Sequence, residues 1–256
     1  MSHEPSAHAH AAHTPEWEVS VWPFVISFGI LFALPVAFGF KFVYGMSFAA
    51  ILALGIGTPM IVAGIVGWVR EGMSSHHGEG LAFPAMGWFI LAEAMIFVSI
   101  FASYWFNRLT AEAWPPAGSI ELPKVLPIVM TCVLVASSFT IHHAEALLQK
   151  GNRPGFNAWL IVTMVLGSVF LGMSAYEWNH LFHENFTADT NLLGTVFFTI
   201  TGLHGSHVIV GLGIFLAVLV PALQGRINEP FVKTAGLYWH FVDIIWFFVV
   251  SQVYYW

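Results

Sequence analysis

Glu93 is the only charged residue between positions 81 and 106, and it lies within the apolar segment FILAEAMIF. In a helix that rises 1.5 Å per residue, Glu93 lies about 18 Å beyond Leu81, which is near the centre of a bilayer. An ionised carboxylate at that depth costs at least about 3 kcal/mol. We therefore expect a protonated acid, for which two roles stay open: a step in a proton relay, or a neutral hydrogen-bonding group between helices.

Two histidine-containing segments have helical spacing. His204 and His207 in TGLHGSHVIVG are three residues apart and therefore share one helix face. They cannot ligate one haem iron from opposite sides, and no H-E-x-x-H motif supports a metal site. We expect buried, hydrogen-bonding histidines at a helix interface. His240 and Asp243 in YWHFVDIIW have the same spacing, and we expect them to bond to each other or to a neighbouring helix.

Other polar residues give weaker signals. His142 and Glu145 form an H-x-x-E pair, but two ligands make a poor metal site. Glu177 in SAYEWNH lies near the end of an apolar segment, so interfacial and proton-exchanging roles are both open. The single cysteine, Cys132, excludes an internal disulfide and any C-x-x-C motif for metal or haem. The sequence therefore predicts no metal site and no catalytic residue.

The composition is that of a membrane protein. Of the 256 residues, 57% are hydrophobic and only 9% are charged, against roughly 25% charged in soluble domains. The net charge of −6 and the lack of a basic block argue against nucleic acid as a partner. A transmembrane helix needs about 20 apolar residues. The segments that qualify are 20–40, 46–69, 81–106, 124–149, 157–179, 191–223 and 232–255.

The sequence thus predicts an all-α integral membrane protein with seven transmembrane helices. Five cationic residues in the loops on one side, against three on the other, favour a cytoplasmic N-terminus. Residues 1–19 form a polar tail without Lys, Arg or an apolar core, so they are not a signal peptide. Exposed imidazoles titrate near neutral pH, so the tail is either a proton collector or a flexible solubilising segment. Its histidines are His3, His8, His10 and His13.

Six motifs together resemble subunit III of the haem-copper cytochrome c oxidases. In chain order they are VREG followed by HH (69–77), AEAMIF (92–97), WPPAG (114–118), HHAEALLQKGNR (142–153), GLHGSHVIVG (202–211) and YWHFVDIIWFFVVSQVYYW (238–256). The resemblance extends from about residue 68 to the C-terminus, and its last two motifs are the most specific.

This resemblance implies a non-catalytic subunit without cofactors of its own. In the family, the haems, the copper ions and oxygen reduction belong to the catalytic subunit I and the copper-bearing subunit II, and cytochrome c is reached only through the complex. The chain agrees, since it has no His-Pro pair and too few cysteines for a dinuclear copper site. Family members are expected to sustain proton uptake, to protect the catalytic subunit during turnover and to bind structural phospholipids.

The resemblance also implies positions for lipid and for the buried acid. Structural lipids are expected in a lipid-filled, V-shaped cleft between helices I–II (20–69) and helices III–VII (70–256). Glu93 matches the membrane-embedded glutamate of the family, and Arg70, His77 and Arg226 match side chains that approach lipid head groups. Arginine suits this role because its planar guanidinium pairs with phosphate. The expected location is the bacterial inner membrane.

Three alternative functions fit the sequence less well. Subunit III of a quinol oxidase usually lacks the two leading spans that are present here. A stand-alone proton-linked transporter needs inward-facing polar residues along several spans, and most spans here have almost none. A free-standing membrane enzyme needs a converging metal or nucleophile site, which the sequence does not offer.

Overall fold

The computed structural model describes residues 20–74 and 82–256. These described residues are helical or irregular and include no strand. Contacts divide the chain into two compact units, Met1–Ser75 and His76–Trp256. The predicted boundary lay at 69/70, whereas the second helix continues through Arg70 to Ser74.

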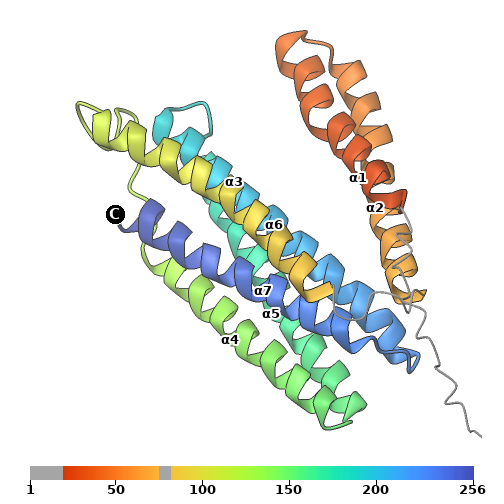
Figure 1. The fold of residues 1–256 in the computed structure, drawn as a ribbon. Coiled ribbons are helices and arrows are strands. Elements are labelled where there is room, and N and C mark those ends of the chain that lie inside the picture. Colours follow the sequence, from red (N-terminus) through yellow and green to blue (C-terminus); the bar gives the residue numbers. More distant parts are fainter. Residues whose placement is uncertain (1–19, 75–81) are drawn as a thin grey trace, which may run out of the picture. The chain divides into compact units, whose positions relative to one another are not determined.

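The first unit is a helix pair, and the second is a bundle of five helices (Figure 1). The pair consists of α1 (Trp22–Leu31), the π-helical turns η1 (Phe32–Val36) and η2 (Gly39–Val43), and α2 (Ser47–Ser74). The bundle consists of α3 (Ala82–Thr110), α4 (Val125–Gln149), α5 (Arg153–His183), α6 (Leu192–Leu223), α7 (Glu229–Val249) and η3 (Val250–Tyr254). Seven helical stretches in the described residues are long and apolar enough to cross a membrane, which confirms the predicted spans and the all-α class.

Asparagine side chains fix the starts of three helices in the bundle. The side-chain oxygen of each accepts a hydrogen bond from the amide three residues further on, at distances of 2.9–3.1 Å. Such a cap satisfies one of the amides that a helix leaves free at its N-terminus. The capping residues are Asn152, Asn191 and Asn228. Because Asn152 acts as a cap, α5 begins at Arg153 rather than at the predicted residue 157.

Backbone contact between small residues holds the helix pair together. A methyl group built on Gly57 of α2 would lie 2.5 Å from the Ala33 nitrogen and 2.6 Å from the Gly29 oxygen. A methyl group on Gly29 would lie 2.8 Å from the Ile61 nitrogen. Small residues allow this approach, which favours helix association in membranes, where no hydrophobic force drives it.

We expect Gly57→Ala to destabilise the protein by about 1 kcal/mol, at the lower end of the cost of overpacking. The added methyl group has to displace backbone atoms of α1 and η1 rather than a flexible side chain. The measurement is the sodium dodecyl sulfate concentration that unfolds the protein in mild detergent. Gly55→Ala is the matched control, since nothing lies within 4 Å of a methyl group there. Equal midpoints for the two variants would contradict the backbone contact.

Helix α7 forms the centre of the five-helix bundle. It packs against α3, α4 and α6, and Figure 1 shows it between α3 and α4. Of the seven spans it has the largest buried share. Its side chains Tyr238, Trp239 and Trp246 are among the largest that are fully buried in the described residues. The core of the bundle is therefore aromatic.

Trp239 joins four helices. Its indole Nε1 donates to Ser137 Oγ of α4 at 2.9 Å, and its ring lies 5.0 Å from that of Phe215 on α6. A methyl group on Gly167 of α5 or on Gly211 of α6 would lie 2.7 Å from the indole ring. The indole therefore fills the space that these two glycines leave open.

A cation–π cluster fixes the C-terminal segment against α3. The Arg108 guanidinium lies 4.3 Å from the ring centre of Trp256 and 5.5 Å from that of Trp114. Arg108 also donates to the Tyr104 hydroxyl at 2.8 Å, and this hydroxyl donates to the Gln252 carbonyl at 2.8 Å. Arginine over aromatic faces contributes roughly 0.5–2 kcal/mol per contact.

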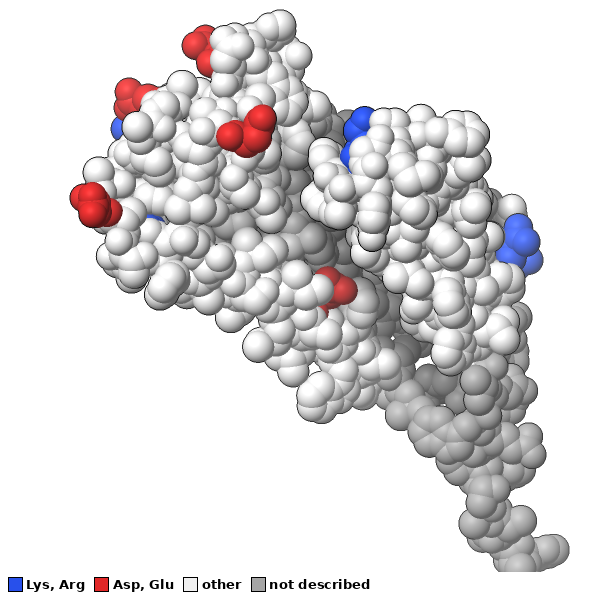
Figure 2. Space-filling view, turned by 90° about the horizontal axis from the view of Figure 1, so that it is seen from above, with Lys and Arg blue, Asp and Glu red and all other residues white. Residues whose placement is uncertain are grey.

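Few charged side chains lie on the surface. Figure 2 shows a face that is almost wholly uncharged, with isolated Asp, Glu, Lys and Arg residues. Large apolar side chains such as Phe48, Trp88 and Phe106 are exposed, at 74%, 73% and 68%. A soluble monomer rarely exposes apolar patches of this extent, whereas a membrane or partner subunits would cover them.

Candidate functional site

Glu93 of α3 and His207 of α6 form a hydrogen-bonded pair. Glu93 Oε2 lies 3.0 Å from His207 Nε2, although 114 residues separate the two in sequence. The side chains are 21% and 10% exposed, respectively. The acid that the sequence singles out therefore has an imidazole partner on a neighbouring helix.

The second contact of the imidazole shows which of its nitrogens carries a hydrogen. His207 Nδ1 lies 2.8 Å from the Leu203 carbonyl oxygen. A carbonyl oxygen only accepts, so Nδ1 carries a hydrogen. If His207 is neutral, its Nε2 carries none and accepts the hydroxyl of a protonated Glu93. If His207 is cationic, its Nε2 donates to an ionised Glu93. In both arrangements the two side chains share a single proton.

Aromatic groups surround this pair. The Phe97 ring centre lies 5.0 Å from that of His207, and the Phe241 ring centre lies 6.4 Å away. The Tyr238 hydroxyl donates to the His207 carbonyl at 3.3 Å. These contacts bring α3 and α7 against His207 and give its imidazole an apolar setting, in which separated charges are costly.

His204 occupies a different environment from His207. It is 1% exposed, and its ring lies 4.9 Å from that of Trp246 and 5.6 Å from that of Phe170. Neither ring nitrogen has a hydrogen-bond partner among the described residues. Both histidines were expected to be buried and hydrogen-bonded. His207 is hydrogen-bonded, whereas His204 is held by aromatic packing.

His240 and Asp243 of α7 meet through a serine of α4. Ser138 Oγ lies 3.0 Å from His240 Nδ1, and it also makes a short hydrogen bond with Asp243 Oδ2. Asp243 is 5% exposed, and its other oxygen has no partner among the described residues. Ser138 was not among the residues predicted from the sequence. Its position four residues before His142, on the same helix face, was the available signal.

Glu177 is deeply buried in the five-helix bundle. It is 2% exposed and accepts a hydrogen bond of 2.8 Å from the Tyr254 hydroxyl in η3. The second carboxyl oxygen has no partner among the described residues. Glu177 was predicted as a buried polar group between helices, and its role in proton exchange stays a prediction.

The residues expected to contact lipid are described in part. Arg70 is exposed near the end of α2. Arg226 is exposed in the turn before α7, where it donates to the Gln224 side chain. His77 lies outside the described residues. So do the tail histidines His3, His8, His10 and His13, and the roles suggested for them stay predictions.

Comparisons with known proteins agree with the motifs. A family model described as cytochrome c oxidase subunit III matches residues 10–256. Cytochrome c oxidase subunit 3 of Synechocystis sp. is 36% identical over 184 residues, covering 70% of this chain and 78% of that protein. The protein of the same name from Mammuthus primigenius is 32% identical over 274 residues, covering 100% and 99%. Because the match covers nearly the whole chain and the motifs lie within it, this protein belongs to the cytochrome c oxidase subunit III family.

Proposed function

We propose that the chain is a non-catalytic subunit of a proton-pumping cytochrome c oxidase. Family membership makes it a subunit of this oxidoreductase complex, with partner subunits. The proposed partners are the catalytic subunit I and the copper-bearing subunit II, which hold the haems and the copper. The proposed tasks of this chain are to stabilise the catalytic subunit, to bind structural phospholipids and to support proton uptake.

The Glu93–His207 contact is the observation that carries the proton-uptake proposal. A carboxyl group and an imidazole lie 3.0 Å apart within a membrane span, a distance at which they can share one proton. Ionisable groups inside a membrane are costly, and they commonly mark proton relays. A group that holds a proton next to the catalytic subunit supports proton traffic without itself taking part in oxygen reduction.

Comparing the oxidase purified with and without this chain tests the proposal. The complex without the chain should keep its haem spectrum, its copper content and its initial rate of oxygen consumption. Its activity should then decline faster during turnover, and the decline should be steepest at alkaline pH, where protons are scarce. Loss of haem or copper together with the chain would assign a cofactor to it and would contradict the non-catalytic role.

The lipid-binding proposal gives a prediction for Arg70. Arg70→Gln should lower the number of phospholipids that co-purify with the complex, because a guanidinium pairs with a phosphate through two charge-assisted hydrogen bonds. Lys150→Gln is the control, since it removes one exposed positive charge from the α4–α5 turn. Phosphorus analysis after extensive detergent washing measures the effect. Equal lipid retention in both variants would remove the support for a specific head-group contact.

A further inference from the structure

A second set of ionisable side chains lies along the contact between α4 and α7. We name it the α4–α7 polar ladder. The α4 residues are four and three positions apart and therefore share one face. The α7 residues lie opposite. The ladder consists of Ser138, His142, Glu145, Lys233, His240 and Asp243.

One end of the ladder, the end farther from the connecting turns, is the Ser138 bridge between His240 and Asp243. Its hydroxyl contacts both groups, but a hydroxyl donates only one hydrogen bond. In one arrangement, Nδ1–H of His240 donates to Ser138, which donates to an ionised Asp243. In the other, a protonated Asp243 donates to Ser138, which donates to Nδ1 of His240. The two arrangements differ by one proton passed through the hydroxyl, and neither breaks the hydrogen-bonded chain.

The other end of the ladder reaches the turns that follow α4 and precede α7. The Glu145 carboxylate packs directly on the Gly236 backbone of α7, where an added methyl group would overlap its Oε1. Glu145 lies within electrostatic range of His142 and Lys233, and His240 lies within electrostatic range of His142. The α4–α5 turn lies beside the α6–α7 turn, because Arg153 donates to the Gly225 carbonyl at 3.1 Å.

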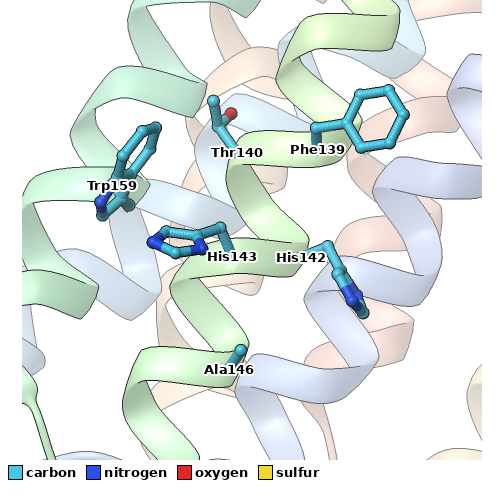
Figure 3. A pocket seen from close by; sticks show the side chains of 6 residues that line it. All are labelled: Phe139, Thr140, His142, His143, Ala146 and Trp159. Carbon is cyan, nitrogen blue, oxygen red and sulfur yellow. The ribbon is translucent and has the colours of Figure 1, made fainter.

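These groups line the α4–α7 contact over about half the thickness of a bilayer. Lys233 and Asp243 are ten residues apart, which corresponds to about 15 Å along a helix, against roughly 30 Å for the hydrocarbon core. His142 also borders a surface hollow of about 490 Å³ that is lined by Phe139, His143 and Trp159. Figure 3 shows that His143 points toward Trp159, whereas His142 points to the other side of α4.

Neither metal binding nor simple packing explains the ladder as well. No group of three potential ligands among the described residues is placed to hold a metal ion. Packing alone does not call for ionisable groups at successive turns, because each one inside a membrane is costly. We infer that the α4–α7 polar ladder is a proton-carrying half-path that connects the buried Asp243 with the loop end of the bundle. A proton taken from water at that end passes by way of His142, His240 and Ser138 to Asp243.

This inference goes beyond the proposed function, since it assigns a proton path to a different set of residues. Its test does not depend on oxygen reduction. The assembled oxidase is transferred to deuterium oxide, and the infrared carboxylic-acid band that is absent from Asp243→Asn is followed with time. We expect the band to be present and to shift readily to its deuterated position, although Asp243 is 5% exposed. Ser138→Ala and His142→Phe should slow this exchange by about tenfold or more, equivalent to about 1.4 kcal/mol in the barrier.

Two control variants separate a relay from a structural contact. Ser138→Thr keeps the hydroxyl and should restore fast exchange. Ser99→Ala removes an exposed hydroxyl that bonds only to its own helix, at 2.7 Å from the Ile96 carbonyl, and should leave the exchange unchanged. His142 is exposed, so its replacement tests the path without disturbing the core. Wild-type exchange rates in both Ser138→Ala and His142→Phe, or the absence of an Asp243 acid band, would overturn the inference.

Discussion

Replacement of His207 by Phe is expected to lower the free energy of unfolding by about 1–3 kcal/mol, because it leaves the Glu93 carboxyl group without its hydrogen-bond partner. Adding Glu93→Leu to this variant should restore most of the lost stability, since removing both partners of a buried hydrogen bond is nearly neutral. The double substitution should therefore be less harmful than His207→Phe alone. Unfolding in sodium dodecyl sulfate, measured for both single variants and for the double variant, gives the coupling energy.

The outcome also reports where the shared proton lies. Desolvation of two charges often exceeds their mutual attraction, so we expect a neutral acid and a neutral imidazole. Wild-type protein should then show an infrared carboxylic-acid band that disappears in Glu93→Gln. A hydrophobic carbodiimide, which reacts with protonated acids, should label Glu93 in preference to the exposed Glu112 and Glu121. Additive effects of the two substitutions would contradict the pairing, and a missing band would indicate an ion pair.

Trp239→Ala is expected to cost about 3–5 kcal/mol, the largest effect of any single substitution considered for this chain. The indole is fully buried, and its loss leaves a cavity between Gly167 and Gly211 that the backbone cannot close. The hydrogen bond to Ser137 is lost as well. The midpoint of unfolding in sodium dodecyl sulfate should fall accordingly, and the yield of folded protein should fall with it.

Two comparison variants separate packing from hydrogen bonding at this position. Trp239→Phe keeps an aromatic ring but lacks the indole N–H donor. Losing the hydrogen bond to Ser137 is expected to lower the free energy of unfolding by about 1 kcal/mol. Trp88→Ala removes an indole that is 73% exposed, and its effect on the isolated protein should be small. A loss for Trp239→Ala no larger than that for Trp88→Ala would contradict the role of Trp239 in joining the helices.

The seven spans could be predicted because length and apolarity alone define them. The precise starts could not, since a cap such as Asn152 depends on local backbone geometry as well as on residue type. The π-helical turns of the first span were missed for a similar reason. Pro35 lies within η1, and a proline inside a helix removes a hydrogen bond and crowds the preceding turn, but the sequence does not specify how the backbone adapts.

The candidate site could be predicted as a set of residues, but not as a set of contacts. Glu93 and His207 were both identified because ionisable groups stand out in apolar segments. Their pairing depends on which face of α3 meets α6, and a nearly uniform apolar span gives no periodic signal for that face. Ser138 was missed because serines often bond to their own helix and carry no further meaning.

The central position of α7 has a consequence for biogenesis. Helices enter the membrane in chain order, so α3 to α6 are inserted before the helix around which they pack. Until α7 arrives, Ser138 and the glycine notches at 167 and 211 face an unfilled space or lipid. Helix α7 also has the lowest mean hydropathy of the seven spans. We therefore expect its insertion to be assisted by the polar partners on the helices that are already in the membrane. We therefore expect the bundle to complete its packing only after the last span has been inserted.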